Sequence, residues 1–236
     1  MFNNILLFYN KNCNLSKKLK DYLYKNSKKC FLVDNSNPKK KVKIILKKNL
    51  YFDYIFSFRN YYILKKDIIK KANVAAINFH PGTPKYRGVG CINYALYDNA
   101  KIYGSTAHII NEKIDNGQII NIKKFKIPKN ITLDACLKKT HKIMYTQAME
   151  IFKKLKTTHN AELLNKWIEN HKQIKWSNKL KNRRKLDIFY KLDLTKTKLK
   201  IENKIKSTYT KDFYPYIEIK NNKYYLLKKK DMKFKN

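Results

Sequence analysis

The fold is best approached from the stretch Ile77-Asn78-Phe79-His80-Pro81-Gly82-Thr83-Pro84-Lys85-Tyr86-Arg87-Gly88-Val89-Gly90. It follows an apolar run, 74–77, that is typical of a buried strand, and it then breaks into a loop rich in proline and glycine. An apolar pattern with helical spacing resumes at Cys91. A polar Asn and a His at the end of a buried strand stand where open α/β sheets hold their reactive groups. The stretch therefore predicts an α/β fold with a site near Asn78 and His80.

Short apolar runs alternate with helical patterns over the first 175 residues. The runs predict strands at 4–9, 30–33, 54–58, 74–78, 104–110 and 118–127. Helical spacing predicts helices at 15–24, 64–71, 91–97 and 161–171, and a long helix capped by Thr132. The polar, basic stretch 35–41 is predicted to be a surface loop. This alternation predicts a mainly parallel sheet flanked by helices.

The chain changes character after residue 175. Residues 175–185 are polar and very basic, 195–206 predict a capped helix, and 214–227 predict a hairpin turning at Asn221-Asn222. We therefore expect a catalytic domain at 1–175 and a small α+β subdomain at 176–236. The hairpin is a candidate homodimer surface, or else a cover for the main domain or its sheet edge.

Charge is the most unusual feature of the composition. The 236 residues carry a net charge of +37, but only four of the basic residues are arginine, and the lysines are spread along the chain. We interpret this as the bias of an AT-rich coding sequence on solvated faces, with a dedicated polyanion patch as the alternative. No apolar run has the length of a membrane span and the start lacks a secretory signal. The sequence therefore predicts a soluble, cytoplasmic protein.

Glycine is scarce and concentrated. All five glycines (82, 88, 90, 104 and 117) lie in one part of the chain, which predicts positive φ angles or close backbone approach there. The first predicted turn, 10–14, contains none, so the dinucleotide motif G-x-G-x-x-G is absent. The four cysteines and five histidines show no metal-ligand spacing, and we expect buried thiols and no metal.

Three polar side chains form a candidate catalytic set: Asn78, His80 and Asp115. Asn78 and His80 lie two apart on an extended chain and project to the same side, and Asp115 follows the strand 104–110. An amide, an imidazole and a carboxylate can carry acyl transfer to an amine, with the amide stabilising the oxyanion and the imidazole stabilising it or relaying a proton. The alternative is that His80 is only structural. No Ser or Cys stands in a nucleophile-elbow context, which favours direct transfer.

These segments are recognisable together. Asn78-Phe79-His80-Pro81, Arg87-Gly88 and Ile114-Asp115-Asn116-Gly117-Gln118-Ile119-Ile120 resemble the folate-dependent formyltransferase family, most strongly over 54–127. The resemblance implies a Rossmann-like sheet, 10-formyltetrahydrofolate as formyl donor and Asn78, His80 and Asp115 as catalytic residues. It also implies that His108 orients Asp115, with a histidine that only packs within its strand as the alternative. The implied folate-binding residues are Phe58, Tyr62, Ile63, Leu64, Asn111 and Glu112, with core packing as the alternative for Tyr61, Tyr62 and Leu64.

The acceptor is the open point of this resemblance. The loop Pro81-Gly82-Thr83-Pro84 is one residue shorter than the family's frequent Ser-Leu-Leu-Pro form and resembles the branch that acts on nucleotide-linked amino sugars. The implied substrate loop comprises Gly82, Thr83, Pro84, Tyr86 and Arg87. Methionyl-tRNA is the alternative acceptor, favoured by the charge, but that branch carries a C-terminal β-barrel for which too few residues remain. A non-catalytic, basic RNA-binding protein is the second alternative.

Overall fold

The computed structural model describes residues 1–158 and 161–228. It divides into two compact units. Unit 1 consists of 1–84, 104–124 and 140–176, and unit 2 consists of 85–103, 125–139 and 177–236. The last segment of unit 1 ends at the expected boundary near residue 176, but unit 2 also takes in two earlier segments. A separate subdomain formed by 176–236 alone therefore stays a prediction.

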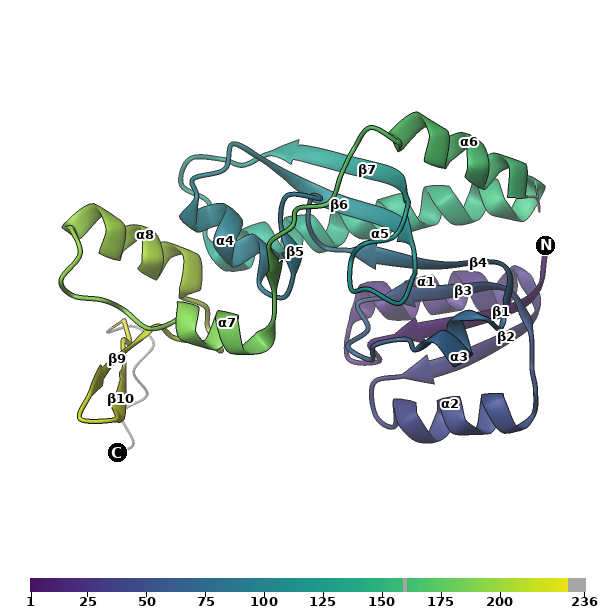
Figure 1. The fold of residues 1–236 in the computed structure, drawn as a ribbon, viewed down its shortest axis with the longest axis horizontal. Helices are drawn as coiled ribbons and strands as arrows, with labels where there is room; N and C mark the ends of the chain where they lie inside the picture. The colour runs from purple at the N-terminus through teal and green to yellow at the C-terminus, as the bar shows by residue number, and fades with distance from the viewer. Residues whose placement is uncertain (159–160, 229–236) are drawn as a thin grey trace. The chain divides into compact units, whose positions relative to one another are not determined.

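A six-stranded sheet runs in the order β2-β1-β3-β4-β6-β7 (Figure 1). Neighbouring strands are parallel from β2 through β1 and β3 to β4, whereas β6 runs antiparallel to β4. This arrangement confirms the predicted α/β class and its mainly parallel sheet. The strands are β1 (Phe2–Tyr9), β2 (Ser27–Asp34), β3 (Phe52–Phe58), β4 (Ala72–His80), β6 (Ile102–Ile109) and β7 (Ile119–Lys126).

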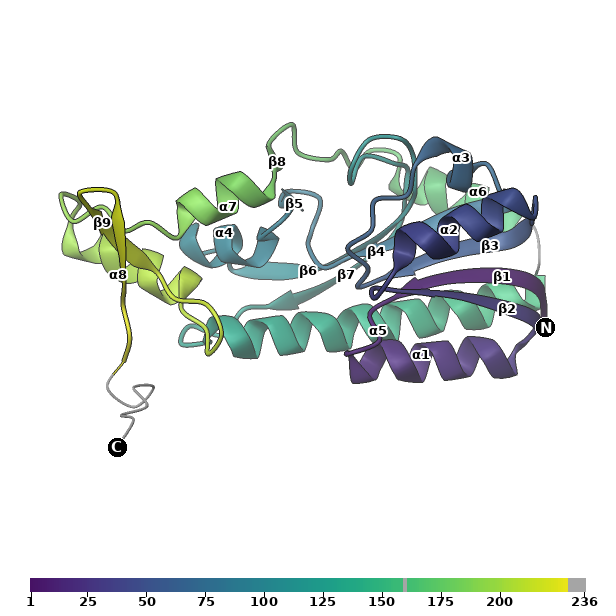
Figure 2. The same cartoon turned by 90° about the horizontal axis from the view of Figure 1, so that it is seen from below.

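Strand β1 shows why a continuous apolar run belongs in the middle of such a sheet. Ile5 and Leu7 pack on the face covered by α1 and α5, while Leu6 and Phe8 pack on the face covered by α2 and α3 (Figure 2). Burial of both faces requires an apolar side chain at every position instead of an alternating pattern. The helices of unit 1 are α1 (Asn14–Lys25), α2 (Pro38–Lys47), α3 (Lys66–Ile69), α5 (Leu133–Thr158, shared with unit 2) and α6 (Ala161–His171).

Helix α2 is a correction, because its first residues fall in the stretch predicted to be a loop, 35–41. The side chain of Asn37 accepts a hydrogen bond from Lys40 N at 3.3 Å, and Pro38 occupies the first helical turn. Both are favoured at helix starts. Val42 and Ile45 are the buried positions of the helix. The lysine-rich first turn conceals this short apolar pattern in the sequence.

Unit 2 has its own core around α4 (Cys91–Tyr97). Tyr86, Cys91 and Tyr103 are buried in it together with Cys136. Gly88 and Gly90 have φ angles of 91° and 73°, which confirms the expectation for the glycine-rich stretch. The other elements of unit 2 are β5 (Arg87–Gly88), β8 (Leu180–Lys181), α7 (Arg183–Phe189), α8 (Lys198–Thr208), β9 (Tyr216–Ile219) and β10 (Asn222–Tyr225).

Three expectations for the C-terminal part are corrected. Helix α7 was not predicted; Asn182 caps it by accepting from Lys185 N at 2.9 Å within a basic stretch that has no clear apolar period. The helix expected from Thr195 begins at Lys198. The hairpin turns at Lys220-Asn221, one residue earlier than predicted, because Asn222 already pairs with Ile219.

The β9–β10 hairpin exposes several large apolar side chains, including Ile219, Tyr224 and Tyr225. Exposed apolar groups on a short two-stranded sheet are a candidate contact surface. No second chain is present to test this, so a homodimer through the hairpin stays a prediction.

The four cysteines are free thiols. Cys13, Cys91 and Cys136 are buried and Cys30 is half-buried, as expected for thiols in apolar surroundings. Within 1–158 and 161–228, no helix is both long and apolar enough to cross a membrane.

The corrected start of α2 is testable. Asn37→Ala removes the capping oxygen and should lower the free energy of unfolding by about 1 kcal/mol, whereas Asn37→Asp keeps the oxygen and should be as stable as the wild type. Lys39→Ala, in the same exposed turn, is the control. Urea unfolding followed by circular dichroism measures all three variants. Equal stability of Asn37→Ala and the wild type would contradict the cap.

Candidate active site

Asn78 and His80, two residues of the candidate set, lie at the C-terminal end of β4. In the antiparallel pair β4–β6, Asn78 stands opposite His108 and His80 stands opposite Thr106. Asn78 Nδ2 lies 3.2 Å from His108 Nε2 as a result. β6 ends at Ile109, opposite Ile77, so the loop that follows begins next to Asn78, and Asp115 within it reaches His80 and His108.

The loop between β6 and β7 is held closed at its base. Ile109 N donates a hydrogen bond to Gln118 O at 2.9 Å. At Gly117 a Cβ atom would lie 1.7 Å from Ile109 O, so no larger residue fits this close approach. Asp115 itself has a φ of 41°, in the left-handed region that costs free energy for a residue other than glycine. A strained residue in a tightly closed loop is typical of a functional position.

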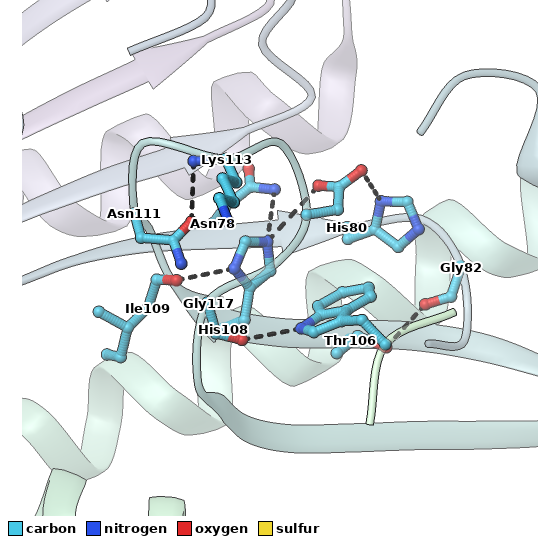
Figure 3. A network of polar contacts seen from close by, with 11 residues as sticks. Asn78, His80, Gly82, Thr106, His108, Ile109, Asn111, Lys113 and Gly117 are labelled. Atoms are coloured by element: carbon cyan, nitrogen blue, oxygen red, sulfur yellow. Dashed lines mark hydrogen bonds and ion pairs between the residues drawn. The ribbon is translucent and has the colours of Figure 1, made fainter. Parts of the chain in front are cut away.

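The loop delivers the Asp115 carboxylate to two imidazoles. Asp115 Oδ2 lies 3.2 Å from His80 Nδ1, and Oδ1 lies 3.6 Å from His108 Nε2. Both histidine side chains are 3% exposed and the Asp115 side chain is 10% exposed. The contacts drawn in Figure 3 link Asn78, His80 and His108 into one network. The structure therefore brings together all four residues that the sequence put forward as catalytic or supporting.

Hydrogen-bond partners assign the protons of the two rings. His108 Nδ1 lies 2.8 Å from Ile109 O, and a carbonyl only accepts, so Nδ1 carries the proton. In the neutral ring, Nε2 then accepts from the amide nitrogen of Asn78, and Nε2 can donate to Asp115 only when the ring is protonated. His80 Nδ1 faces a carboxylate oxygen and donates to it, so a proton exchanged with a substrate would pass through Nε2.

Electrostatics keeps Asp115 ionised. Burial acts to raise the pKa of its carboxyl group, but the positive charge and hydrogen bonds that His80 and His108 supply outweigh burial. The net effect holds the pKa of Asp115 well below its usual range. A carboxylate that is ionised at neutral pH can orient the His80 ring and stabilise the imidazolium that forms when the ring takes up a proton.

The two segments expected to bind folate lie next to each other. Lys66, at the start of α3, forms an ion pair with Glu112 at 2.9 Å. This contact joins the chain just after 58–64 to the loop that carries Asp115. Both side chains are largely exposed, so the ion pair contributes little free energy and serves here as a marker of proximity.

The predicted folate residues differ in exposure. Phe58 and Leu64 are buried in the core, which leaves only their backbone groups to a ligand. Tyr62 stacks on Phe8 with ring centroids 6.0 Å apart, so one face of its ring is used in core packing. Ile63 is exposed, as are Asn111 and Glu112. Their folate contacts stay a prediction.

The predicted substrate loop is tightly held by the protein itself. Gly82 O accepts a hydrogen bond from Thr106 at 2.7 Å, and Gly82, Thr83 and Pro84 are buried. In unit 2, Tyr86 is buried and Arg87 donates to Ser177 O at 3.4 Å. Burial raises the pKa of the Tyr86 hydroxyl, and Asp98 raises it further. Direct contact of these residues with an acceptor stays a prediction.

Trp176, in the basic stretch 175–185, is a neighbour of the cluster for which the sequence predicted no role. Its indole Nε1 donates to Gly117 O at 2.8 Å, within the loop that carries Asp115. A tryptophan at the edge of an otherwise polar, lysine-rich segment was the available signal, because such a side chain needs a packing partner. Over the residues that the structure describes, no three His, Cys, Asp or Glu side chains gather as a metal site.

A model of the formyl transferase family matches residues 32–150. The chain belongs to the formyl transferase family. It is 38% identical over 88 residues to the bifunctional polymyxin resistance protein ArnA of Wigglesworthia glossinidia brevipalpis, covering 37% of this chain and 14% of the relative. It is 25% identical over 150 residues to methionyl-tRNA formyltransferase of Finegoldia magna, covering 63% of this chain and 43% of that protein. The chain thus spans less than half the length of either relative.

Solved structures of family members share the fold over almost the whole chain. A sugar N-formyltransferase from Shewanella superposes with a TM-score of 0.66 at 18% identity, covering 96% of both chains. An N-formyltransferase from Helicobacter canadensis, solved with folinic acid and dTDP-3-aminofucose, gives a TM-score of 0.65 at 19% identity, covering 94% of this chain and 86% of that one. At these identities the likeness establishes the fold.

The pKa of Asp115 generates a prediction about stability and pH. A folded-state pKa below the unfolded value of about 4 means that the carboxylate stabilises the fold above that pH and loses this contribution as the pH falls. Asp115→Asn should therefore cost about 2 kcal/mol at pH 7, the worth of a charged hydrogen bond, and less at pH 3.

Urea unfolding of the wild type and Asp115→Asn at pH 7, 5 and 3 measures this difference. Asp21→Asn, an exposed carboxylate on α1, is the matched control and should show little change at any of these values. A difference between wild type and Asp115→Asn that stays constant from pH 7 to pH 3 would contradict the lowered pKa.

Proposed function

We propose that this chain transfers the formyl group of 10-formyltetrahydrofolate to the amine of a nucleotide-linked amino sugar. The observation that carries the proposal is the buried cluster of Asn78, His80, His108 and Asp115 at the end of β4. It joins an amide donor, a proton-transfer group and a fixed carboxylate within a few ångströms. These are the groups that direct acyl transfer to an amine needs.

Each residue has a separate part in the proposed reaction. The acceptor amine attacks the formyl carbon, and a C–N bond forms as the carbonyl oxygen becomes an oxyanion. The Asn78 amide has two N–H donors; one is directed at His108, and the other stabilises the oxyanion. His108 in this account orients Asn78 as well as Asp115.

Collapse of the tetrahedral intermediate breaks the bond between the formyl carbon and N10 of the folate. The proton lost by the attacking amine must reach N10, which leaves as the amine of tetrahydrofolate. His80 Nε2 carries that proton, and Asp115 stabilises the imidazolium formed on the way. The products are the N-formylated acceptor and tetrahydrofolate, with no change of oxidation state.

Two comparisons support the choice of substrates. The Helicobacter canadensis enzyme was crystallised with folinic acid and dTDP-3-aminofucose, and the sugar 3N-formyltransferase WlaRD was crystallised with dTDP and 5-N-formyl-THF. The second, over 94% of this chain, has a TM-score of 0.61 and 22% identity. The net charge of +37 would attract a nucleotide diphosphate in the same way as any other anion.

Methionyl-tRNA is the second candidate acceptor. The curated relatives include methionyl-tRNA formyltransferases, and a strongly basic chain suits an RNA substrate. The two candidates differ only in the acceptor, since the donor and the proposed chemistry are the same.

Release of tetrahydrofolate from 10-formyltetrahydrofolate, measured with a panel of acceptors, tests the function. The panel contains dTDP- and UDP-linked amino sugars and charged initiator tRNA. Turnover is expected with an amino sugar, and Asn78→Ala, His80→Gln and Asp115→Asn should each lower kcat by at least about 100-fold.

His171→Gln is the matched control, because His171 lies on α6 and its side chain bonds to Trp167 O of the same helix. It should keep wild-type turnover. Activity only with charged tRNA would move the assignment to the second candidate. No turnover with any acceptor, together with salt-sensitive RNA binding, would favour a non-catalytic RNA-binding protein.

A further inference from the structure

Trp176 packs against two members of the catalytic cluster, His80 and His108. Its ring centroid lies 5.0 Å from that of His108 and 5.6 Å from that of His80, at interplanar angles of 80° and 77°. Edge-to-face packing at these distances is favourable for aromatic rings. Among the ring contacts of the described residues, the indole of Trp176 is the one aromatic side chain that packs against both imidazoles.

The indole also holds the loop that carries Asp115. Nε1 donates to Gly117 O at 2.8 Å, a well-formed hydrogen bond. Gly117 is the position at which the loop backbone touches Ile109 O, next to the ring of His108. The ring of Trp176 therefore holds both imidazoles in place, and its N–H group holds the end of the Asp115 loop at Gly117.

Water is the natural competitor of the acceptor in formyl transfer. If water attacks the formyl carbon and the bond to N10 breaks, the products are formate and tetrahydrofolate, and no acceptor is modified. The histidines are almost wholly shielded, at 3% exposure each, and the Trp176 ring covers them. Removing the indole would leave a space next to two imidazoles and the Gly117 carbonyl, which is polar enough to hold water.

We propose that Trp176 is a positioning residue that latches the Asp115 loop through its N–H group and shields the two imidazoles from water through its ring. The inference rests on the proposed function for its consequence in catalysis. Its geometric part concerns only the free protein and can be tested without a substrate.

Three variants separate the hydrogen bond to the Asp115 loop from the shielding of the imidazoles. Trp176→Phe keeps an aromatic ring and loses the N–H donor; kcat should fall by about 5-fold, the effect of one hydrogen bond, with formate release still minor. Trp176→Ala loses both functions; kcat should fall by about 100-fold, as for a misplaced catalytic group. Trp176→Leu, which fills most of the space, serves if the Ala variant does not fold.

The decisive ratio in these assays is formate released per acceptor formylated. It should rise several-fold in Trp176→Ala or Trp176→Leu and stay near the wild-type value in Trp176→Phe. The KM values of donor and acceptor should change little. Trp167→Phe, the other tryptophan of the chain and part of the core on α6, is the matched control and should leave kcat and the ratio unchanged.

Imidazole signals in the free protein give a readout that needs no turnover. Long-range 1H–15N spectra, assigned with His80→Gln and His108→Gln, should show the His80 Nδ1 proton slowly exchanging with water in the wild type and Trp167→Phe. Exchange should become fast in Trp176→Ala or Trp176→Leu.

The two readouts separate the possible failures. If the wild type formylates nothing but the His80 proton is protected by Trp176, the proposed function falls and the geometric inference stands. If proton exchange and the formate ratio are the same in the wild type and in the folded Trp176→Ala or Trp176→Leu variant, the inference about Trp176 is wrong.

Discussion

The site depends on one buried carboxylate, Asp115, held between two imidazoles. A charge that is almost wholly removed from water is costly unless hydrogen bonds and an opposite charge compensate it. His80 supplies a hydrogen bond at 3.2 Å, and His108, when its ring is protonated, supplies positive charge at 3.6 Å. In return the carboxylate fixes the orientation of the His80 ring, and the Asn78 amide is held against His108 at 3.2 Å. Removal of Asp115 therefore disturbs all the other members of the set.

The sheet makes this arrangement possible. β6 runs antiparallel to β4 and ends at Ile109, opposite Ile77, so the loop that follows begins beside Asn78. Asp115 within this loop reaches His80 and His108. The close approach of Gly117 to Ile109 O holds the two ends of the loop together, and Asp115 in this loop faces His80. The close approach at Gly117 and the strained φ of Asp115 serve one requirement, which is to place a carboxylate against His80.

Much of this could be predicted from sequence because the signals are local. Asn78 and His80 stand two residues apart after a buried run, and the Asp115 segment has its own recognisable pattern. The start of α2 and the whole of α7 were missed, because lysines fill the turns in which an apolar period would appear. Trp176 was missed for another reason: its partners, Gly117, His80 and His108, are distant in sequence, and no local pattern reveals a contact of that kind.

The most direct test of the account is a crystal structure of the protein soaked with folinic acid, the stable 5-formyl analogue of the proposed donor. The account predicts that the pterin lies between 58–64 and 111–115, with the formyl-bearing part of the folate directed at Asn78 and His80 and within about 4 Å of their side chains. Ordered folate elsewhere, or no folate at saturating concentration while Asn78, His80 and Asp115 keep the geometry described above, would contradict it.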